Sequence, residues 1–391
     1  MKISQRVLEL AESATLAVDA KAARMKAEGI DVVSLGAGEP DFDTPRHIKD
    51  AAYAALQAGK TKYPKPASGI PEAKKAVCEK FKRENGLSYE PSQVIITAGG
   101  KMGCLLTFLA ALDPGDEVIL PAPYWVSYPE QIKLAGAKAV VVPCSESDGF
   151  ALRGAQVAAA LSPRTRMLVL NYPSNPGGFT YPPAAVREIA EAIRGRDLVV
   201  LSDEMYDQLV FGGGEHLSFA ATGPDAYAKT VTLSAGSKTY SMTGWRIGYA
   251  AGPKPIIDAM AKLQSQSTSG AATFTQWALV EALHGDQSCV RQMRAEFEQR
   301  ARHMHRRLAE MPGVTCLVPT GAFYCFPNVS GTYARRGVRG SVEFATRLLE
   351  EAKVGVVPGE AFGADAHVRL SFATSLEQID KALDRMAAWL R

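Results

Sequence analysis

The sequence has no CxxC pair, no long apolar run and no strong excess of charge, and each absence excludes a class of protein. Its six cysteines are scattered, which is typical of small core residues in a reducing compartment and argues against disulfides or a zinc site. No apolar run is long enough to span a bilayer, and the first residues lack the apolar region of a secretory signal. A net charge of +3 does not indicate nucleic acid or a membrane surface as a partner. The sequence therefore predicts a cytoplasmic protein without a metal, membrane or nucleic-acid partner.

The residues that are present describe a long globular chain. It has 391 residues, of which 47% are hydrophobic and 22% are charged, so two domains are expected. In the middle of the chain, short apolar runs such as residues 94–98, 117–121 and 198–201 alternate with helical stretches. Such runs are typical of parallel strands that helices cover on both faces. The sequence therefore predicts an α/β fold with a mostly parallel central sheet flanked by helices.

The two ends of the chain differ from this middle. Residues 1–44 contain one amphipathic helix and a loop rich in glycine and proline, whereas residues 286–391 contain a long charged helix followed by short strands. We expect both ends to form one smaller α+β domain, and residues 45–285 to form the larger domain that carries the main binding site.

Four motifs follow predicted strands, at the edge where open α/β sheets bind ligands. In the first, Lys238 could form a Schiff base, and Arg246, eight residues later, could hold an anion. The alternative is an ordinary solvent-exposed loop lysine. The segment is also weakly similar to a P-loop, but Ser237 stands where that motif requires glycine.

The other three motifs are weak when each is taken alone. Asp203, with Tyr206 three residues later, could address two atoms of one planar ligand, although a helix-capping aspartate is an equal alternative. Residues 171–178 form a rigid segment rich in hydrogen-bonding groups, or a simple turn. Gly99 and Gly100 stand at a strand-to-helix junction whose free N–H groups suit a phosphate. Their joint order and spacing carry the argument.

That order resembles the class I aminotransferases and is closest to the prokaryotic branch of aspartate aminotransferase. The resemblance covers essentially the whole chain through the segments LGAGEPDFDTP, TKYPKPASGIPE, TAGGK, PAPYWVSYPE, NYPSNPGG, SDEMYD, SKTYSMTGWRIGY, VVPGEAFG and HVRLSFATS. It implies fold type I, a homodimer and pyridoxal 5′-phosphate as cofactor.

The resemblance also implies roles for individual residues. Lys238 corresponds to the lysine that forms the Schiff base and later carries the proton, and Asp203 to the acid that pairs with the ring nitrogen. The remaining cofactor contacts are Tyr206 and Asn175 at the phenolic oxygen, Trp125 stacked on the ring, Gly99, Gly100 and Lys101 in the backbone cradle of the phosphate, Arg246 and Ser237 at the phosphate, and Tyr63 lent by the other subunit.

Substrate binding is implied for a second, overlapping set. Arg369 and Gly38 correspond to positions that hold the substrate α-carboxylate, and Trp125 and Asn175 also face the substrate. A planar guanidinium suits this task because it meets a carboxylate with two hydrogen bonds; the alternative for Arg369 is a structural salt bridge. Lys101 could serve the distal carboxylate of a dicarboxylic substrate, or could be a solvent-facing loop lysine.

Two departures from the family pattern bear on function. Ala235 stands where many relatives carry a phosphate-binding serine, and Ser234 or Ser237 could compensate. Members of the branch that accept prephenate carry a lysine in the N-terminal segment, where this chain has Ala11 beside Glu12. The second departure makes prephenate a less favoured substrate.

The expected reaction is ping-pong transamination between L-aspartate and 2-oxoglutarate, giving oxaloacetate and L-glutamate. The nearest alternative is an aminotransferase of the same fold for aromatic or neutral amino acids, or for prephenate. A pyridoxal-dependent lyase is a more distant alternative. The sensor half of a pyridoxal-dependent transcription factor would need an appended DNA-binding domain, for which this fold leaves no room.

Overall fold

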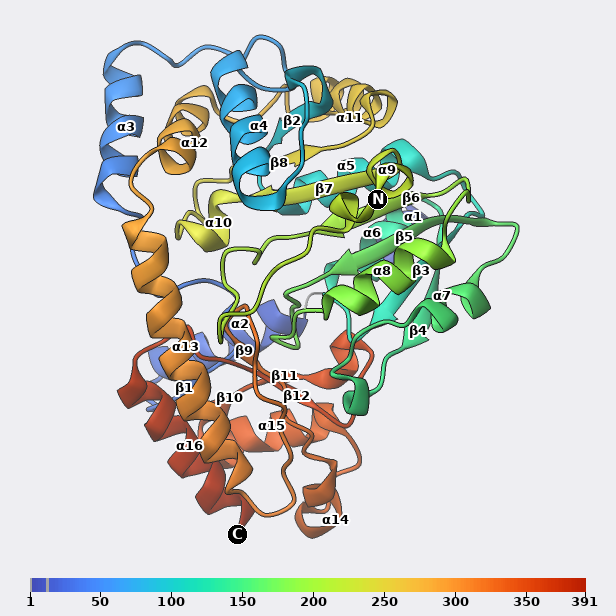
Figure 1. Ribbon diagram of the computed structural model, residues 1–391. Helices are drawn as coiled ribbons and strands as arrows, with labels where there is room; N and C mark the ends of the chain where they lie inside the picture. Colours follow the sequence, from blue (N-terminus) through green and yellow to red (C-terminus); the bar gives the residue numbers. More distant parts are fainter. Residues whose placement is uncertain (1, 12–13) are drawn as a thin grey trace.

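A seven-stranded sheet forms the centre of the protein in the computed structural model, which describes residues 2–11 and 14–391 (Figure 1). The strand order is β2-β8-β7-β6-β5-β3-β4, and β8 alone runs antiparallel to its neighbours. The strands are β2 (Val94–Thr97), β3 (Glu117–Ala122), β4 (Lys138–Pro143), β5 (Thr165–Asn171), β6 (Val199–Asp203), β7 (Thr230–Ala235) and β8 (Gly248–Ala251). The predicted α/β fold with a mostly parallel sheet is confirmed.

Helices cover both faces of this sheet, which explains why its strands are apolar almost throughout. Alternate residues of one strand enter different clusters: Ile95 packs in one hydrophobic core, and Val94 and Ile96 pack in another. The helices and 3₁₀ turns of this part are α3 (Arg46–Gln57), α4 (Pro71–Asn85), η1 (Pro91–Gln93), α5 (Gly100–Ala111), α6 (Ser127–Leu134), η2 (Glu146–Asp148), α7 (Gly154–Ala160), α8 (Pro183–Ala192), η3 (Phe219–Thr222), α9 (Pro224–Tyr227), α10 (Gly236–Thr239), α11 (Lys254–Ser267) and α12 (Thr273–His284).

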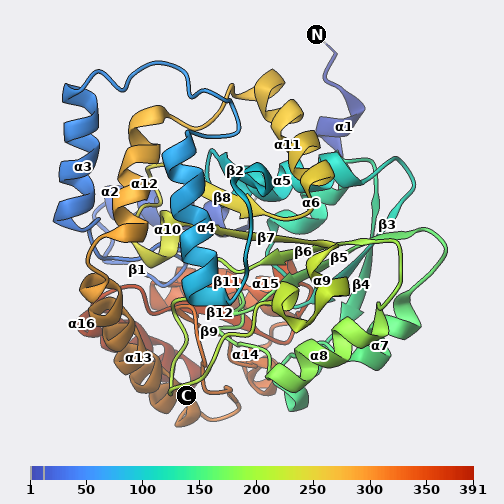
Figure 2. The ribbon, with the colours of Figure 1, turned by 45° about the horizontal axis from the view of Figure 1, so that its top comes forward.

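Residues 14–34 and residues 288–391 meet below the sheet in the view of Figure 1. Strand β1 (Val33–Ser34) pairs with β10 (Val354–Gly355), and β11 (Val357–Pro358), β12 (Val368–Ser371) and β9 (Tyr324–Cys325) form a second small sheet. The surrounding elements are α2 (Ala14–Ala27), α13 (Ser288–Ala309), η4 (Ser330–Thr332), α14 (Tyr333–Arg336), α15 (Ser341–Ala352), η5 (Gly359–Phe362) and α16 (Leu376–Leu390). Helix α1 (Gln5–Leu8) lies apart from them, beside α6 in Figure 2. Figure 2 shows α13 and α16 side by side in a second view, in keeping with their direct contact.

The N-terminal segment differs from its prediction in one respect. One amphipathic helix was expected within residues 1–44, whereas the structure has two helices, α1 and α2. Helix α1 buries no side chain, so its residues had no core-facing stripe that could reveal it. The domain boundaries near residues 44 and 285 stay a prediction.

The strand directions bring the four sequence motifs to one edge of the sheet. Strands β2 and β7 are both antiparallel to β8, so β2 points the same way as β5, β6 and β7. The residues after these four strands therefore share an edge. Gly248 of β8 packs directly on the turn after β2, where an added Cβ would lie 2.7 Å from the Gly100 nitrogen. In the described part of the chain, no helix is long and apolar enough to cross a membrane.

Candidate active site

A cavity of about 470 Å³ lies at this edge of the sheet. All of the predicted site residues except Gly99 and Tyr63 line it: Gly38, Gly100, Lys101, Trp125, Asn175, Asp203, Tyr206, Ser237, Lys238, Arg246 and Arg369. Gly99 adjoins the cavity through Arg246, whereas Tyr63 is 78% exposed. The structure thus gathers residues from five strand ends and from both termini around one space.

Lys238 lies on α10, immediately after β7, and its ammonium group donates a hydrogen bond to the Gly38 carbonyl oxygen. Burial lowers the pKa of Lys238 to about 8, and the charges of Arg369 and Arg246 act in the same direction. An amine of lowered pKa is unprotonated in a larger fraction of molecules near neutral pH, as a nucleophile or a proton acceptor requires. The alternative of an ordinary solvent-exposed lysine is therefore wrong.

Asp203 ends β6 with its carboxylate inside the protein. Its Oδ2 accepts hydrogen bonds from the Tyr128 hydroxyl at 2.6 Å and the Cys104 thiol at 3.7 Å, and its Oδ1 accepts one from the Met205 amide at 3.2 Å. Burial raises the pKa of Asp203 to about 6, and these three donors oppose the rise. The carboxyl group is thus an anion at neutral pH in a place that favours a cationic partner. A turn follows it, not a helix, so the capping alternative is wrong.

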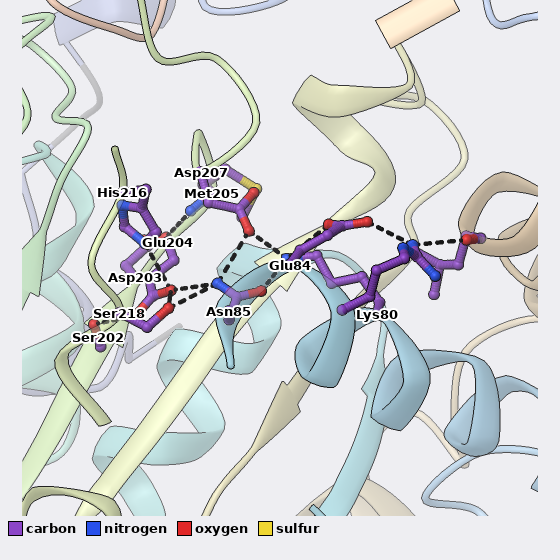
Figure 3. Close-up of polar contacts among 12 residues, drawn as sticks. Lys80, Glu84, Asn85, Ser202, Asp203, Glu204, Met205, Asp207, His216 and Ser218 are labelled. Atoms are coloured by element: carbon purple, nitrogen blue, oxygen red, sulfur yellow. Dashed lines mark hydrogen bonds and ion pairs between the residues drawn. The ribbon is translucent and has the colours of Figure 1, made fainter. Parts of the chain in front are cut away.

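The segment after β6 presents its residues to two sides. Asp203 and Tyr206 line the cavity, whereas Glu204 enters a buried polar cluster behind them (Figure 3). The Glu204 carboxylate accepts hydrogen bonds from the Asn85 amide at 3.1 Å, the Ser218 hydroxyl at 2.6 Å and the Ser202 hydroxyl at 2.9 Å. The His216 imidazole also contacts it, at 2.8 Å.

Lys80 completes this cluster from α4 and pairs with the Asp207 carboxylate (Figure 3). Its ammonium group also donates to Asn85 Oδ1 at 2.8 Å and lies 3.5 Å from Glu84 Oε2. Burial by itself would lower the pKa of Lys80, but the charges of Asp207, Tyr249 and Glu84 together with the hydrogen bond to Asp207 raise it. Burial by itself would raise the pKa of Asp207, but the charges of Lys80 and His216 together with hydrogen bonds from Lys80 and Asn85 lower it. This ion pair anchors the residues that carry Asp203 and Tyr206.

Arg369 lies on β12, lines the cavity and is 1% exposed. Its Nη1 donates to Asn175 Oδ1 at 2.8 Å and its Nη2 to the Gly36 carbonyl oxygen at 2.6 Å. Its Nε is buried and has no hydrogen-bond partner among the described residues. Arg369 makes no salt bridge in the part of the chain that the structure describes, so the structural salt-bridge alternative is not realised. An unpaired buried donor on a guanidinium suits an incoming carboxylate.

Glycine is required where β2 turns into α5. Gly99 has φ +85°, and an added Cβ would lie 2.5 Å from Arg246 Nη2. A Cβ on Gly100 would lie 2.2 Å from the Met205 Cε atom. Helix α5 begins at Gly100, so its first N–H groups lie beside the Arg246 guanidinium. A helix start next to an arginine can bind a phosphate.

Lys101 and Trp125 form the wall beside this turn. The Lys101 ammonium group lies 5.1 Å from the centre of the Trp125 ring. Burial lowers the pKa of Lys101, and the nearby Arg246 charge lowers it further. Lys101 lines the cavity and is also exposed to solvent, so the alternative of a solvent-facing lysine stays open. Of the two serines that could replace the family serine at Ala235, Ser237 lines the cavity.

Tyr128, Glu39 and Thr243 are among the cavity residues that the sequence did not predict. Tyr128 stands one helical turn after Trp125, a spacing that could have indicated it. Glu39 follows Gly38 directly in the sequence. Its carboxylate accepts a hydrogen bond at 2.7 Å from the hydroxyl group of Thr243, which also lines the cavity. Glu12, which together with Ala11 stands where prephenate-accepting relatives carry a lysine, lies outside the residues that the structure describes.

Comparisons with known proteins agree with the fold and the cavity. The family model of aminotransferase class I and II matches residues 30–386. An aspartate aminotransferase of Geobacillus stearothermophilus is 48% identical over 99% of this chain and 98% of the relative. An aspartate/prephenate aminotransferase of Nitrosomonas europaea is 44% identical over 100% of both chains. The solved structure of Thermus thermophilus aspartate aminotransferase with maleate has a TM-score of 0.94 and 45% identity, and the match covers 100% of both chains.

The chain belongs to the class I and II aminotransferase family. It is an enzyme that catalyses transamination and depends on pyridoxal phosphate. The cavity fits that cofactor: a buried carboxylate suits its cationic ring nitrogen, an amine stands beside it, and a glycine turn with an arginine suits its phosphate. When bound, pyridoxal phosphate supplies an electron-withdrawing ring that stabilises negative charge on the substrate Cα.

Proposed function

We propose that the enzyme transfers the amino group of L-aspartate to 2-oxoglutarate in a ping-pong reaction, giving oxaloacetate and L-glutamate. The observation that carries this proposal is that two cationic side chains, Arg369 and Lys101, line the same cavity. Amino acids with two carboxylates can engage both. Relatives named aspartate aminotransferase, and a related structure with the dicarboxylate maleate, support it.

Each residue would then have a separate task. Arg369 would bind the substrate α-carboxylate through its unpaired Nε and the adjoining nitrogen, with the Gly38 backbone alongside. Lys238 would accept the proton from the substrate Cα and deliver it to the cofactor C4′ carbon, since its lowered pKa lets it act in both directions near neutral pH. Asp203 would hold the ring nitrogen in its protonated state, because a buried anion stabilises an adjacent cation.

The remaining cofactor contacts are proposed on the same cavity. Tyr206, whose hydroxyl lies 3.1 Å from that of Tyr324, would contact the phenolic oxygen together with Asn175. The phosphate would lie on the turn at Gly99, Gly100 and Lys101, with Ser237 and Arg246 as side-chain donors, and Trp125 would stack on the ring.

We also propose a homodimer in the cytoplasm. Tyr63 supports the dimer, because it is 78% exposed and does not line the cavity of its own chain. A second subunit could receive it at the phosphate end. The six cysteines are all free, which supports a reducing compartment.

Prephenate is the second candidate substrate, because relatives at 44% identity are named aspartate/prephenate aminotransferase. The test is a panel of single-turnover half-reactions. The aldehyde form of the bound cofactor is reacted with aspartate, glutamate or phenylalanine, and its amino form is reacted with prephenate. We expect kcat/KM for aspartate to exceed that for phenylalanine by at least about 100-fold, and Lys101→Ala to remove most of that preference. Equal values for the two amino acids would contradict the aspartate proposal. Release of pyruvate and ammonia without a 2-oxo acid would indicate a lyase.

A further inference from the structure

Tyr128 touches two parts of the cavity that come from different regions of the chain. It lies on α6 and is 1% exposed. Its hydroxyl donates to Asp203 Oδ2 at 2.6 Å, and its ring meets the Trp125 ring edge to face, with centroids 5.2 Å apart. The far side of the Tyr128 ring packs on Phe108, at 6.5 Å between centroids. This side chain is thus fixed between the core and the cavity wall.

The hydroxyl contact is the shortest of the hydrogen bonds that Asp203 accepts. The Cys104 thiol is a weak donor at 3.7 Å, and the Met205 amide lies at 3.2 Å. Burial raises the pKa of Tyr128 well above its ordinary value, so its proton stays on the hydroxyl and the group remains a donor. A short O–H bond to a carboxylate favours the ionised form of that carboxylate.

The ring contact acts on the other wall. Trp125 is only partly buried and carries the Lys101 ammonium group 5.1 Å from its ring centre. The Tyr128 ring meets Trp125 at an interplanar angle of 84°, an arrangement that aromatic pairs prefer. Such a contact restrains the tilt of the Trp125 ring before any ligand arrives.

We propose that Tyr128 is a positioning residue for the cofactor, whose hydroxyl keeps Asp203 ionised and oriented and whose ring holds Trp125 for stacking. This inference rests on the proposed roles of Asp203 and Trp125. It adds that one side chain, Tyr128, positions both Asp203 and Trp125. A substitution of Tyr128 should therefore disturb both residues together.

The test uses Tyr128→Phe in the full-length protein from which the cofactor has been removed. Pyridoxal phosphate is titrated at a series of pH values from about 5.5 to 8.5, and binding is followed by visible absorbance. The ratio of the Kd values of variant and wild type cancels the titration of the cofactor itself. The titratable groups that face Asp203 are Cys104 of α5, Tyr128 of α6, Tyr206 and Glu204 of its own segment, and Lys238 of α10.

We expect this ratio to depend on pH. The pKa of Asp203, about 6 in the wild type, should rise by roughly one unit when the hydroxyl is lost, so that Kd increases about twofold at pH 7 and about eightfold at pH 5.5. Toward pH 8.5 the two proteins should converge, since Asp203 is then ionised in both. A ratio that stays constant over the whole range would indicate a merely structural effect and would overturn the inference.

Matched variants separate the possible causes. Tyr89→Phe removes another buried hydroxyl, 3.2 Å from Thr232 and in a different core cluster, and should leave both Kd and its pH dependence unchanged. Asp203→Asn should weaken binding at neutral pH; if it does not, the proposed role of Asp203 fails. If Asp203→Asn weakens binding while Tyr128→Phe follows the wild type at every pH, the inference alone fails.

A second substitution tests the ring. Tyr128→Leu removes both the hydroxyl and the edge-to-face contact, and should bind pyridoxal phosphate more weakly than Tyr128→Phe at every pH, including pH 8.5. Equal affinity of these two variants would overturn the role of the ring. Thermal unfolding shows whether Tyr128→Leu is folded. If it is not, the double variant Tyr128→Phe with Trp125→Leu replaces it. A Kd equal to that of Tyr128→Phe alone would then overturn the role of the ring.

Discussion

Replacing Lys80 with methionine should destabilise the protein strongly although Lys80 touches no ligand. The Lys80 and Asp207 side chains are 2% and 1% exposed, so the substitution leaves Asp207 as a buried anion. Among the described residues, its carboxylate keeps a hydrogen bond from the Asn85 amide at 3.4 Å. Removing one partner of a buried ion pair destabilises a protein by about 3–5 kcal/mol. We expect a loss of that size in the free energy of the first unfolding transition in urea.

The control lies two residues away on the same helix. Lys82 is exposed, so Lys82→Met should change the same free energy by less than about 0.5 kcal/mol. Asp207→Asn combined with Lys80→Met should recover part of the loss, because neither charge is then left alone. The pKa of Asp207 lies below its ordinary value of 3.8, so the pair contributes above about pH 4 and its contribution fades as acid protonates Asp207. A loss below about 1 kcal/mol for Lys80→Met at neutral pH would refute the reasoning.

Three further outcomes are expected. Acetylation of Lys238 in the cofactor-free protein should become faster as pH rises through about 8, because its amine loses its proton there. Mass spectrometry of the modified peptide measures the acetylation rate. A midpoint of its pH dependence near 10.5 would contradict the argument that burial lowers the pKa of Lys238. Gly99→Ala should raise the Kd for pyridoxal phosphate by about tenfold or more without unfolding the protein, since the added Cβ would displace Arg246. An unchanged Kd in equilibrium titration would be evidence against phosphate binding at the turn between β2 and α5. Arg369→Lys should lower kcat/KM for aspartate by about 100-fold while Kd for the cofactor stays within about threefold, because lysine cannot form the paired contact to a carboxylate; comparable losses in both constants would place Arg369 at the cofactor instead.

The position of the site could be predicted because strand ends are readable in the sequence. Asp203 and Lys238 each follow a short apolar run, and the parallel arrangement brings such ends to one edge. The sequence could not show which side chains from distant parts of the chain come into contact at this edge. Tyr128 and Asp203 are 75 residues apart, and nothing in α6 marks that hydroxyl as a partner of an acid.

Buried charge was the least predictable feature. Lys80 stands among charged residues in α4 and resembles any surface lysine, yet it pairs with Asp207 at a separation of 127 residues. The direction of β8 was also unreadable, because four small or apolar residues between turns fit a strand of either direction. In both cases the deciding contact is made by the fold and has no local signal.

The place of β2 in the sheet sets an order of events during synthesis. Among the described strands β2 has β8 as its hydrogen-bonded neighbour, although β8 comes much later in the chain. A growing chain therefore cannot fix the Gly99 turn until β8 has left the ribosome, and Arg369 arrives later still. Since domains fold as their parts emerge, the phosphate turn is complete only after β8 has emerged, and the substrate-binding arginine is added later. Truncated products of translation that end before β8 would consequently not retain pyridoxal phosphate.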